Sequence, residues 1–238
     1  NFSGGGSQFP RRNDIIVSDV TNLVKRSIMA LEVITLVVGQ MQENCYLVYD
    51  SKSLETLIID PGDDADYIER IIADNKLIPR LIIATHGHFD HIMAVTELKL
   101  AYGIPFKIHK NDEFLIKNMR DSAKHFLGID TDPPPPIDEF LNSKSTFKIG
   151  SNSLQIIETP GHTPGSVCLY AKKNNLLLTG DLLFADGAVG RTDFSYSNVE
   201  ELYRSLKKIF KLPPQTQIFS GHGRSSTLIE ESINHQKF

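Results

Sequence analysis

The chain has 238 residues, 40% of them hydrophobic, and a formal net charge of -4, which is ordinary for a globular protein. This acidic balance disfavours nucleic acid as a partner, because binding to a phosphate backbone draws on an excess of Lys and Arg. No apolar run approaches the roughly 20 residues that cross a bilayer, so we expect no membrane partner and, by default, a cytoplasmic location. The two cysteines, Cys45 and Cys168, lie in apolar stretches and are predicted to be buried free thiols.

Residues 1–28 differ from the rest of the chain. They contain a Gly/Ser stretch at residues 3–7, and Met29 then opens a strand-like run. We interpret residues 1–28 as a leader or vector-derived segment outside the core fold, with an organelle-targeting peptide as the alternative. Residues 29–238 are expected to form a single domain, since no repeat or long linker divides them.

The first part of this domain is predicted to be rich in strands. Aliphatic and β-branched residues predict strands at residues 32–38, 45–49 and 56–59. The turn Asp60-Pro61-Gly62 ends the third strand, and Asp63 or Asp64 is expected to cap a helix. A buried strand at residues 81–84 follows. It leads into a polar turn, after which a helix of about three turns is expected to end before Gly103.

The second part returns to strands after a helical stretch. Two helical segments are expected between residues 111 and 142, and the run Pro133–Pro136 is predicted to form a stiff surface loop. Residues 198–211 form an amphipathic pattern, and Asn198, followed three residues later by Glu201, is typical of a helix start. Further strands are predicted at residues 146–149, 154–158, 166–170 and 176–179.

The polar turn after residues 81–84 holds three histidines and an aspartate within the six residues from His86 to His91. Packing does not explain such a density, because His is costly to bury without partners. Neutral imidazole and carboxylate together bind first-row transition metals well. Side chains at these spacings on an irregular turn can divide between two neighbouring ions. The candidate ligands in the turn are His86, His88, Asp90 and His91.

The turn alone has too few donors for two ions. Three later residues, His162, Asp181 and His222, each follow a predicted strand. Each has a glycine beside it, which lets the backbone turn sharply and bring the donor inward. The seven residues together predict a two-metal site.

The motifs H-G-H-F-D-H, T-P-G-H-T, G-D and G-H-G, in this order between strands, resemble those of the metallo-β-lactamase superfamily. The resemblance covers nearly all of residues 29–238 and identifies them as a catalytic domain. It implies an α/β (α+β) fold, a four-layer αββα sandwich of two mixed β-sheets with helices outside, and an active site along the sheet edges. By the same resemblance, one metal is bound by His86, His88 and His162, the other by Asp90, His91 and His222, and Asp181 bridges them.

Within that superfamily the chain resembles the short glyoxalase-II-like (hydroxyacylglutathione hydrolase-like) hydrolases. Asn44-Cys45-Tyr46, Ile59-Asp60-Pro61-Gly62 and Thr179–Phe184 carry this likeness. Asp60 is then expected to orient ligands from behind, although a role in the turn alone explains it equally well. Full-length glyoxalase II has a tyrosine soon after its last ligand histidine and a C-terminal helical region, whereas this chain has Gly223-Arg224 and ends at Phe238.

The resemblance implies metal-assisted hydrolysis of a small-molecule thioester, with Asp90 and Asp181 as catalytic residues and two Zn²⁺ ions as cofactors, Fe or Mn being the alternatives. Arg191 and Arg224 are candidates for holding substrate. Two other hypotheses stay open. The segment Gly190–Phe194 resembles the persulfide dioxygenases, which use one iron, and an inactive metal-binding scaffold would share the fold. The oligomeric state is not predicted.

Overall fold

The computed structural model describes residues 31–235, so the leader assigned to residues 1–28 lies outside the described part. Two six-stranded sheets run through it, in the order β1-β2-β3-β4-β5-β6 and β12-β11-β10-β9-β8-β7. The first sheet consists of β1 (Leu31–Val38), β2 (Glu43–Asp50), β3 (Glu55–Ile59), β4 (Ile78–Ile83), β5 (Phe106–His109) and β6 (Glu139–Leu141). The second consists of β7 (Thr146–Ile149), β8 (Asn152–Glu158), β9 (Val167–Ala171), β10 (Leu176–Gly180), β11 (Gln217–Ser220) and β12 (Ser226–Thr227).

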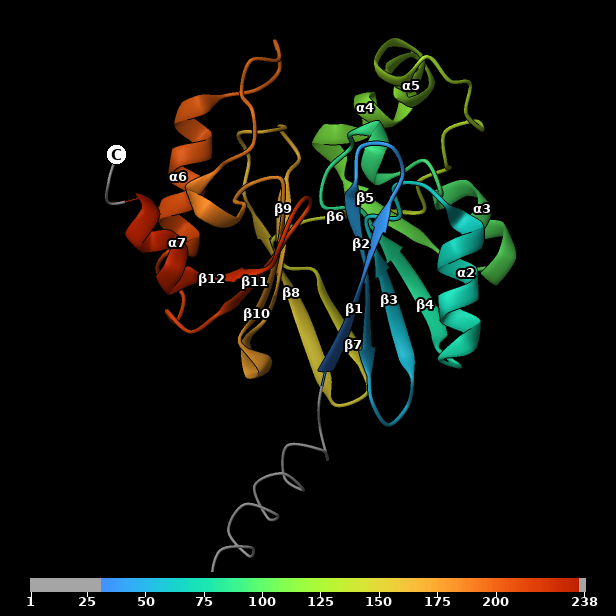
Figure 1. Ribbon diagram of the computed structural model, residues 1–238, viewed down its shortest axis with the longest axis horizontal. Coiled ribbons are helices and arrows are strands. Elements are labelled where there is room, and N and C mark those ends of the chain that lie inside the picture. The colour runs from blue at the N-terminus through green and yellow to red at the C-terminus, as the bar shows by residue number, and fades with distance from the viewer. Residues whose placement is uncertain (1–30, 236–238) are drawn as a thin grey trace, which may run out of the picture.

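Both sheets are mixed. In the first, β1, β2 and β3 pair antiparallel, and the pairs from β3 to β6 are parallel. In the second, only β10 and β11 are parallel. Helices cover the outer faces, and Figure 1 shows α2 and α3 beside the first sheet and α6 and α7 beside the second. The helices are α2 (Ala65–Asp74), α3 (Val95–Tyr102), α4 (Glu113–Lys117), α5 (Met119–Leu127), α6 (Val199–Ile209) and α7 (Leu228–His235).

The packing follows from the two-residue period of a strand. In β2, Cys45 and Leu47 belong to the core under α2 and α3, whereas Tyr46 and Val48 belong to the core between the sheets. In β9, Val167, Leu169 and Ala171 belong to the core between the sheets, whereas Cys168 and Tyr170 belong to the core under α6. Strands buried on both faces read as continuous apolar runs, which is why they were predictable. The expected four-layer αββα sandwich is therefore confirmed.

Two local expectations were wrong. The expected helix does end before Gly103, but it is shorter than expected: α3 begins only at Val95, and a separate 3₁₀ turn occupies Phe89–His91 within the polar turn. The non-helical backbone of Ile92 (φ −138°, ψ −3°) separates them, and Ala94 N–H donates to the carbonyl of Pro61. Asp64 precedes α2 but has φ 52°, and its side chain accepts from Gly39 N–H instead of capping the helix.

Other local expectations hold. Asn198 begins α6 and accepts a hydrogen bond of 3.0 Å from Glu201 N–H. Cys45 and Cys168 are free and buried, and Pro133–Pro136 lies outside helices and strands. Within residues 31–235, no helix combines the length and the apolar character that a membrane crossing requires.

Candidate metal centre

The seven predicted donors come from loops that follow strands of both sheets. His86, His88 and the 3₁₀ turn follow β4, His162 follows β8, Asp181 follows β10 and His222 follows β11. The structure brings all seven together at one edge of the sandwich, where each lies in a group of potential metal-binding atoms within 4.8 Å of one another. Residues far apart in the sequence thus meet because their strands end at the same edge.

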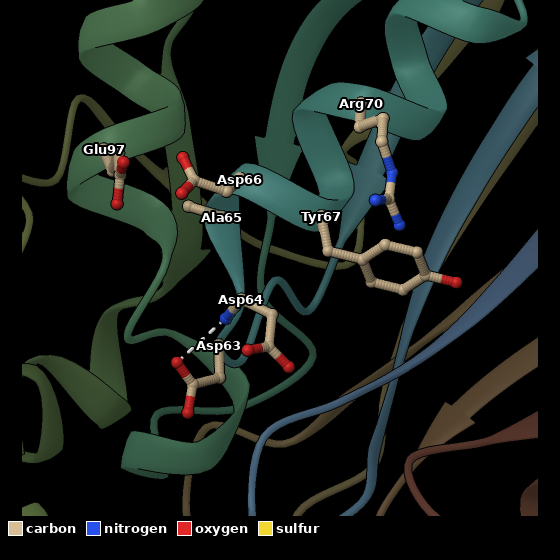
Figure 2. A pocket seen from close by; sticks show the side chains of 7 residues that line it. All are labelled: Asp63, Asp64, Ala65, Asp66, Tyr67, Arg70 and Glu97. Carbon is tan, nitrogen blue, oxygen red and sulfur yellow. Dashed lines mark hydrogen bonds between the residues drawn. The ribbon is translucent and has the colours of Figure 1, made fainter.

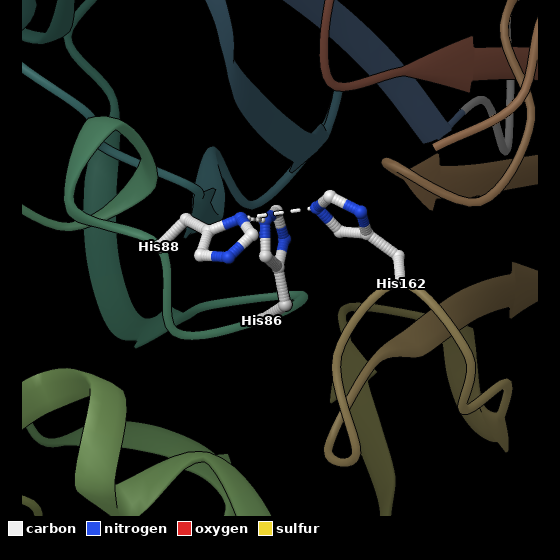
Figure 3. Close-up of side chains that lie close together, drawn as sticks. All are labelled: His86, His88 and His162. Carbon is white, nitrogen blue, oxygen red and sulfur yellow. Dashed lines mark hydrogen bonds between the residues drawn. The ribbon is translucent and has the colours of Figure 1, made fainter. Parts of the chain in front are cut away.

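His86, His88 and His162 form what we call the first half-site, shown in Figure 3. His88 Nδ1 lies 3.0 Å from His86 Nε2 and 3.0 Å from His162 Nε2. A neutral imidazole carries only one N–H, so three such nitrogens cannot satisfy one another fully. Burial lowers the pKa of His88 to about 3, and it also lowers the pKa of His86. These rings are therefore neutral near pH 7, which is the form that binds metal.

Asp90, His91 and His222 form the second half-site. His222 Nε2 lies 3.5 Å from Asp90 Oδ2, and His91 Nε2 lies 4.0 Å from the same carboxylate oxygen. Asp181 lies between the half-sites: its carboxylate is 3.5 Å from His91 Nε2, 3.5 Å from His162 Nε2 and 3.8 Å from His222 Nε2. This is the position expected of a bridging ligand.

The ring nitrogens that face away from the cluster have acceptors that fix the tautomers. His162 Nδ1 lies 2.8 Å from the carbonyl oxygen of Arg191, and His222 Nδ1 lies 3.3 Å from that of Gln42. A carbonyl only accepts, so these nitrogens carry the proton and leave the lone pair on Nε2, toward the cluster. Tyr196 Oη, 2.9 Å from His88 Nε2, can accept the proton there and leave the lone pair on Nδ1.

Asp60 lies behind the two other imidazoles, those of His86 and His91. Its carboxylate accepts from Thr85 N–H and from the Thr85 hydroxyl, both at 2.6 Å. Because that hydroxyl donates to Asp60, its oxygen is left to accept from His86 Nδ1 at 3.2 Å. The second oxygen of Asp60 also lies 3.2 Å from His91 Nδ1. Asp60 therefore lies behind one histidine of each half-site, in addition to its place in the turn before Pro61.

Glu43 is a site residue that the sequence analysis missed. It is buried, its Oε1 lies 3.5 Å from His91 Nδ1, and neither oxygen has a hydrogen-bond partner in the structure. Burial raises the pKa of Glu43 well above its usual range. In the sequence, Glu43 looks like an ordinary polar residue before the strand of Cys45. Only the pairing of β2 with the rest of the sheet shows that it lies behind the cluster.

The charge balance of this region fits metal ions. Four carboxylates meet five histidines there, and no lysine or arginine in residues 31–235 forms an ion pair with any of the four. His91 Nε2 and Asp181 Oδ1 are buried without hydrogen-bond partners. Buried anionic and lone-pair groups without partners are costly unless a cation satisfies them. The donor set, of imidazole nitrogen and carboxylate oxygen, suits a first-row divalent ion.

Asp112, also missed from the sequence, joins the loops of the first half-site. Its carboxylate accepts from Gly87 N–H at 2.9 Å, the Thr163 hydroxyl at 2.7 Å and Gly165 N–H at 2.6 Å. Gly87 lies between two ligands after β4, and Thr163 follows His162. Burial raises the pKa of Asp112 to about 6, although these three donors lower it. This one side chain fixes the spacing between loops from different sheets.

Two of the glycines beside ligands act in different ways. Gly180 has φ +48°, a conformation that favours glycine, and a Cβ there would lie 2.3 Å from Thr85 Oγ1. A Cβ on Gly221 would lie 2.2 Å from Asp181 Oδ1 and 2.8 Å from the His91 ring. Gly221 is thus required for close approach and not for a special backbone angle.

A cavity of about 420 Å³ opens onto the cluster. Arg191 lines it but is bound by Asp193 through two hydrogen bonds of 2.6 Å. Arg224 does not line the described cavity; it pairs with Asp186 at 2.7 Å. The cavity is lined by Met41, His88, Phe89, Asp90, Ser122, Phe126, His162, Asp181, Phe184, Val189, Gly190, Arg191, Phe194, Tyr196 and His222.

Another cavity, of about 470 Å³, lies at the start of α2 (Figure 2). Its polar lining is mainly acidic, with Asp63, Asp64, Asp66 and Glu97 beside Arg70. It shares no residue with the cavity at the metal cluster. The histidine-lined cavity is therefore the candidate site for chemistry.

Comparisons with known proteins agree with this geometry. A family model, described as the metallo-β-lactamase superfamily, matches residues 38–222. The chain is 35% identical to the probable metallo-hydrolase YqgX of Bacillus subtilis, over 82% of this chain and 91% of the relative. It is 32% identical to the hydroxyacylglutathione hydrolase GloC of Haemophilus influenzae, over 85% of this chain and 95% of the relative.

Solved structures show the same fold. A crystal structure of the BLEG-1 B3 metallo-β-lactamase has a TM-score of 0.79 at 32% identity and covers 85% of this chain and 97% of that one. A crystal structure of TTHA1623 in a di-iron-bound form has a TM-score of 0.77 at 34% identity, with coverage of 84% and 96%. The matched residues include all seven donors, and the chain therefore belongs to the metallo-β-lactamase superfamily.

Proposed function

We propose that this protein hydrolyses small thioesters at a site for two divalent metal ions, most simply two Zn²⁺. One observation carries the proposal: the outer nitrogen of each of the five clustered imidazoles lies beside a polar group, so the five inner nitrogens converge beside Asp90 and Asp181. A single tetrahedral ion uses about four donors, and a catalytic one keeps a position open for water. Seven donors in two half-sites suit two ions.

The residues suggest how they would share the ions. His86, His88 and His162 would hold one, Asp90, His91 and His222 the other, and Asp181 both. Bound metal would lower the pKa of a water molecule toward neutrality and polarise the substrate carbonyl. In hydrolysis the water oxygen bonds to the acyl carbon, the carbon–sulfur bond breaks, and a carboxylate and a thiol result. Of the two protons of the water, one passes to the departing thiolate, and the other is released to solvent as the carboxylic acid ionises.

Asp90 and Asp181 face the cavity and are the side chains best placed to orient the attacking water. Their side chains are 11% and 12% exposed, and they line the cavity beside the histidines. Although burial raises the pKa of Asp90, its hydrogen bond with His222 and the charge of His91 lower it below its usual range. Asp90 is therefore ionised and can accept a hydrogen bond from water.

The leaving group favours a thioester over an amide or phosphodiester. A thiol has a pKa of about 8.5, so its thiolate departs with little help from an acid. No lysine in the described lining could supply a proton, and Arg191 is paired with Asp193. The likeness to the hydroxyacylglutathione hydrolase GloC supports the same substrate class, and that to the di-iron form of TTHA1623 supports two ions, with iron as the alternative to zinc.

The test compares kcat/KM at equal, measured metal loading on S-lactoylglutathione, a cephalosporin, bis-nitrophenyl phosphate and glutathione persulfide with oxygen uptake. We expect two metal ions per chain by elemental analysis and the largest kcat/KM on the thioester. Oxygen uptake with the persulfide that exceeds thioester cleavage, in protein holding one iron, would establish a dioxygenase instead. A larger rate on the cephalosporin or the phosphodiester would reject the thioesterase proposal, and full metal loading without turnover of any substrate would favour an inactive scaffold.

A further inference from the structure

Aromatic side chains border both half-sites on the cavity side. The Phe194 ring lies 5.3 Å from that of His88, and the Phe184 ring lies 6.2 Å from that of His222. Phe126, at the end of α5, stacks on Phe89 at 5.7 Å and also lines the cavity. A substrate whose carbonyl reaches the metal cluster must therefore place its neighbouring groups against these rings.

Most polar groups that line the cavity already have a partner within the protein. Asp193 holds the Arg191 guanidinium, as described above, and the Phe194 ring lies 4.3 Å below it. The Tyr196 hydroxyl contacts His88 Nε2 at 2.9 Å. Ser122 supplies the one other hydroxyl in the described lining. A polar substituent beside the scissile bond would lose hydrogen bonds to water and gain few in return, which costs affinity.

The rim of the cavity is apolar as well. Phe126 is 49% exposed and Met41 is 43% exposed, although both line the cavity. Exposed apolar side chains gathered at a cavity mouth mark a site for an apolar ligand. The volume of about 420 Å³ accommodates a small acyl chain or an aromatic ring.

We infer, on the basis of the proposed thioesterase function, that the substrate carries an apolar acyl group, branched aliphatic or aromatic, next to the scissile bond. The thiol portion is then not recognised through its charges, because the cavity offers its carboxylates no unpaired arginine or lysine among the described residues. Transfer of each additional methylene group from water into such a lining increases binding of the transition state about fourfold.

The sharpest test is a matched pair of thioesters of one neutral thiol, N-acetylcysteamine: the lactoyl and the isobutyryl ester. These acyl groups have nearly the same shape, and a hydroxyl in the first replaces a methyl in the second. Each kcat/KM is divided by the rate of the same ester with hydroxide, which removes the difference in intrinsic reactivity. We expect the isobutyryl ester to be preferred at least about fourfold, and a phenylacetyl ester to exceed the acetyl ester by more.

Two variants test whether the preference for apolar acyl groups arises in this cavity. Phe126→Ala should reduce the gain per methylene across a straight-chain series, because half of that ring is exposed and its loss should not disturb the fold. Phe140→Ala is the matched control: its side chain is 41% exposed, it lies in β6 and it does not line this cavity. The control should leave the series unchanged. Circular dichroism and metal content confirm that both variants are folded and loaded.

The outcomes separate this inference from the proposed function. Thioester hydrolysis with equal rates for the matched pair, or with the lactoyl ester preferred, overturns the apolar-acyl inference and leaves the thioesterase proposal standing. If Phe126→Ala and Phe140→Ala reduce the gain in kcat/KM per methylene equally, the inference is also overturned, because the effect would then not come from this cavity. Absence of hydrolysis of every thioester by the loaded protein rejects the proposed function itself.

Discussion

The two half-sites of the metal cluster are supported from behind by different chemistry. In the first, only neutral groups contact the outer nitrogens of the three histidines directly: two side-chain hydroxyls and a backbone carbonyl. In the second, the carboxylates of Asp60 and Glu43 lie 3.2 and 3.5 Å from the outer nitrogen of His91. Burial lowers the pKa of His88 to about 3. Burial acts on His91 in the same direction, but Asp181, Asp60 and the other nearby carboxylates raise its pKa well above the ordinary value.

Because of this difference, the two half-sites can bind metal ions with different affinities although their ligands are of similar types. A carboxylate behind an imidazole makes the ring a stronger donor, and outer partners of this kind change metal affinity substantially. We therefore expect the second half-site to depend on its supporting carboxylates, and the first to depend on the geometry of its loops. The experiments below test this contrast.

The largest effect should come from Asp181, which both half-sites share. Asp181→Ala should lower kcat/KM on a thioester by several orders of magnitude, as should His88→Ala, because metal and water lose their positions. Asp130→Ala, an exposed aspartate paired only with Lys124, is the control. Circular dichroism should show an unchanged fold. Near-normal rates in either variant would mean that these residues are structural.

The next effect concerns Glu43 and the second half-site. Glu43→Gln should weaken the binding of one of the two ions about 10- to 100-fold and leave the other nearly unchanged. Competition with a chromogenic chelator, followed in two steps, measures both affinities. Glu139→Gln replaces an exposed glutamate of β6 and should change neither. Equal loss at both ions, or no loss, would contradict the proposed contrast.

A smaller effect concerns Asp112 and the loops of the first half-site. Its pKa is 3.8 in an unperturbed chain and about 6 when buried here. A carboxyl with a raised folded pKa favours folding while protonated; this contribution is complete below about pH 4 and is lost as the pH rises through about 6. The melting temperature of metal-free Asp112→Asn, relative to the parent, should therefore increase between pH 4 and 7. A difference independent of pH would contradict this.

The smallest effects should distinguish the two arginines. Arg224→Ala should change kcat/KM by less than about twofold, because the side chain is half exposed and pairs with Asp186 and Glu230 away from the cavity. Arg191→Ala should raise KM several-fold, since the guanidinium lies over the Phe194 ring and its removal disturbs the apolar lining, without any contact with a substrate charge. Steady-state kinetics decide between them, and a larger loss in Arg224→Ala would restore it as a substrate-binding residue.

The parts of the site that could be predicted from the sequence are those with a distinctive pattern within a short segment of the chain. His86 to His91 combine rare residue types in a short turn, and His162, Asp181 and His222 each follow an apolar strand with glycine beside them. The sandwich was equally accessible, because strands buried on both faces read as apolar runs.

Glu43 and Asp112 could not be found in this way, because their importance depends on partners that are distant in sequence. Asp112 follows β5, a strand too short to predict, and meets Gly165 from the other sheet. Glu43 becomes a site residue only when β2 lies beside the loop of His91. The 3₁₀ turn at Phe89–His91 was missed for a similar reason, since the carbonyl that receives Ala94 N–H belongs to Pro61.

The origin of the ligands in two sheets has a consequence for the lifetime of the protein. His86 and His91 follow a strand of one sheet, whereas His162, Asp181 and His222 follow strands of the other. Ions bound here would link the loops of the two sheets. An ion that binds only the folded chain stabilises that chain by RT ln(1 + [M]/Kd). The supply of metal in the cell would then control how long the folded molecule survives proteolysis, in addition to how fast it works.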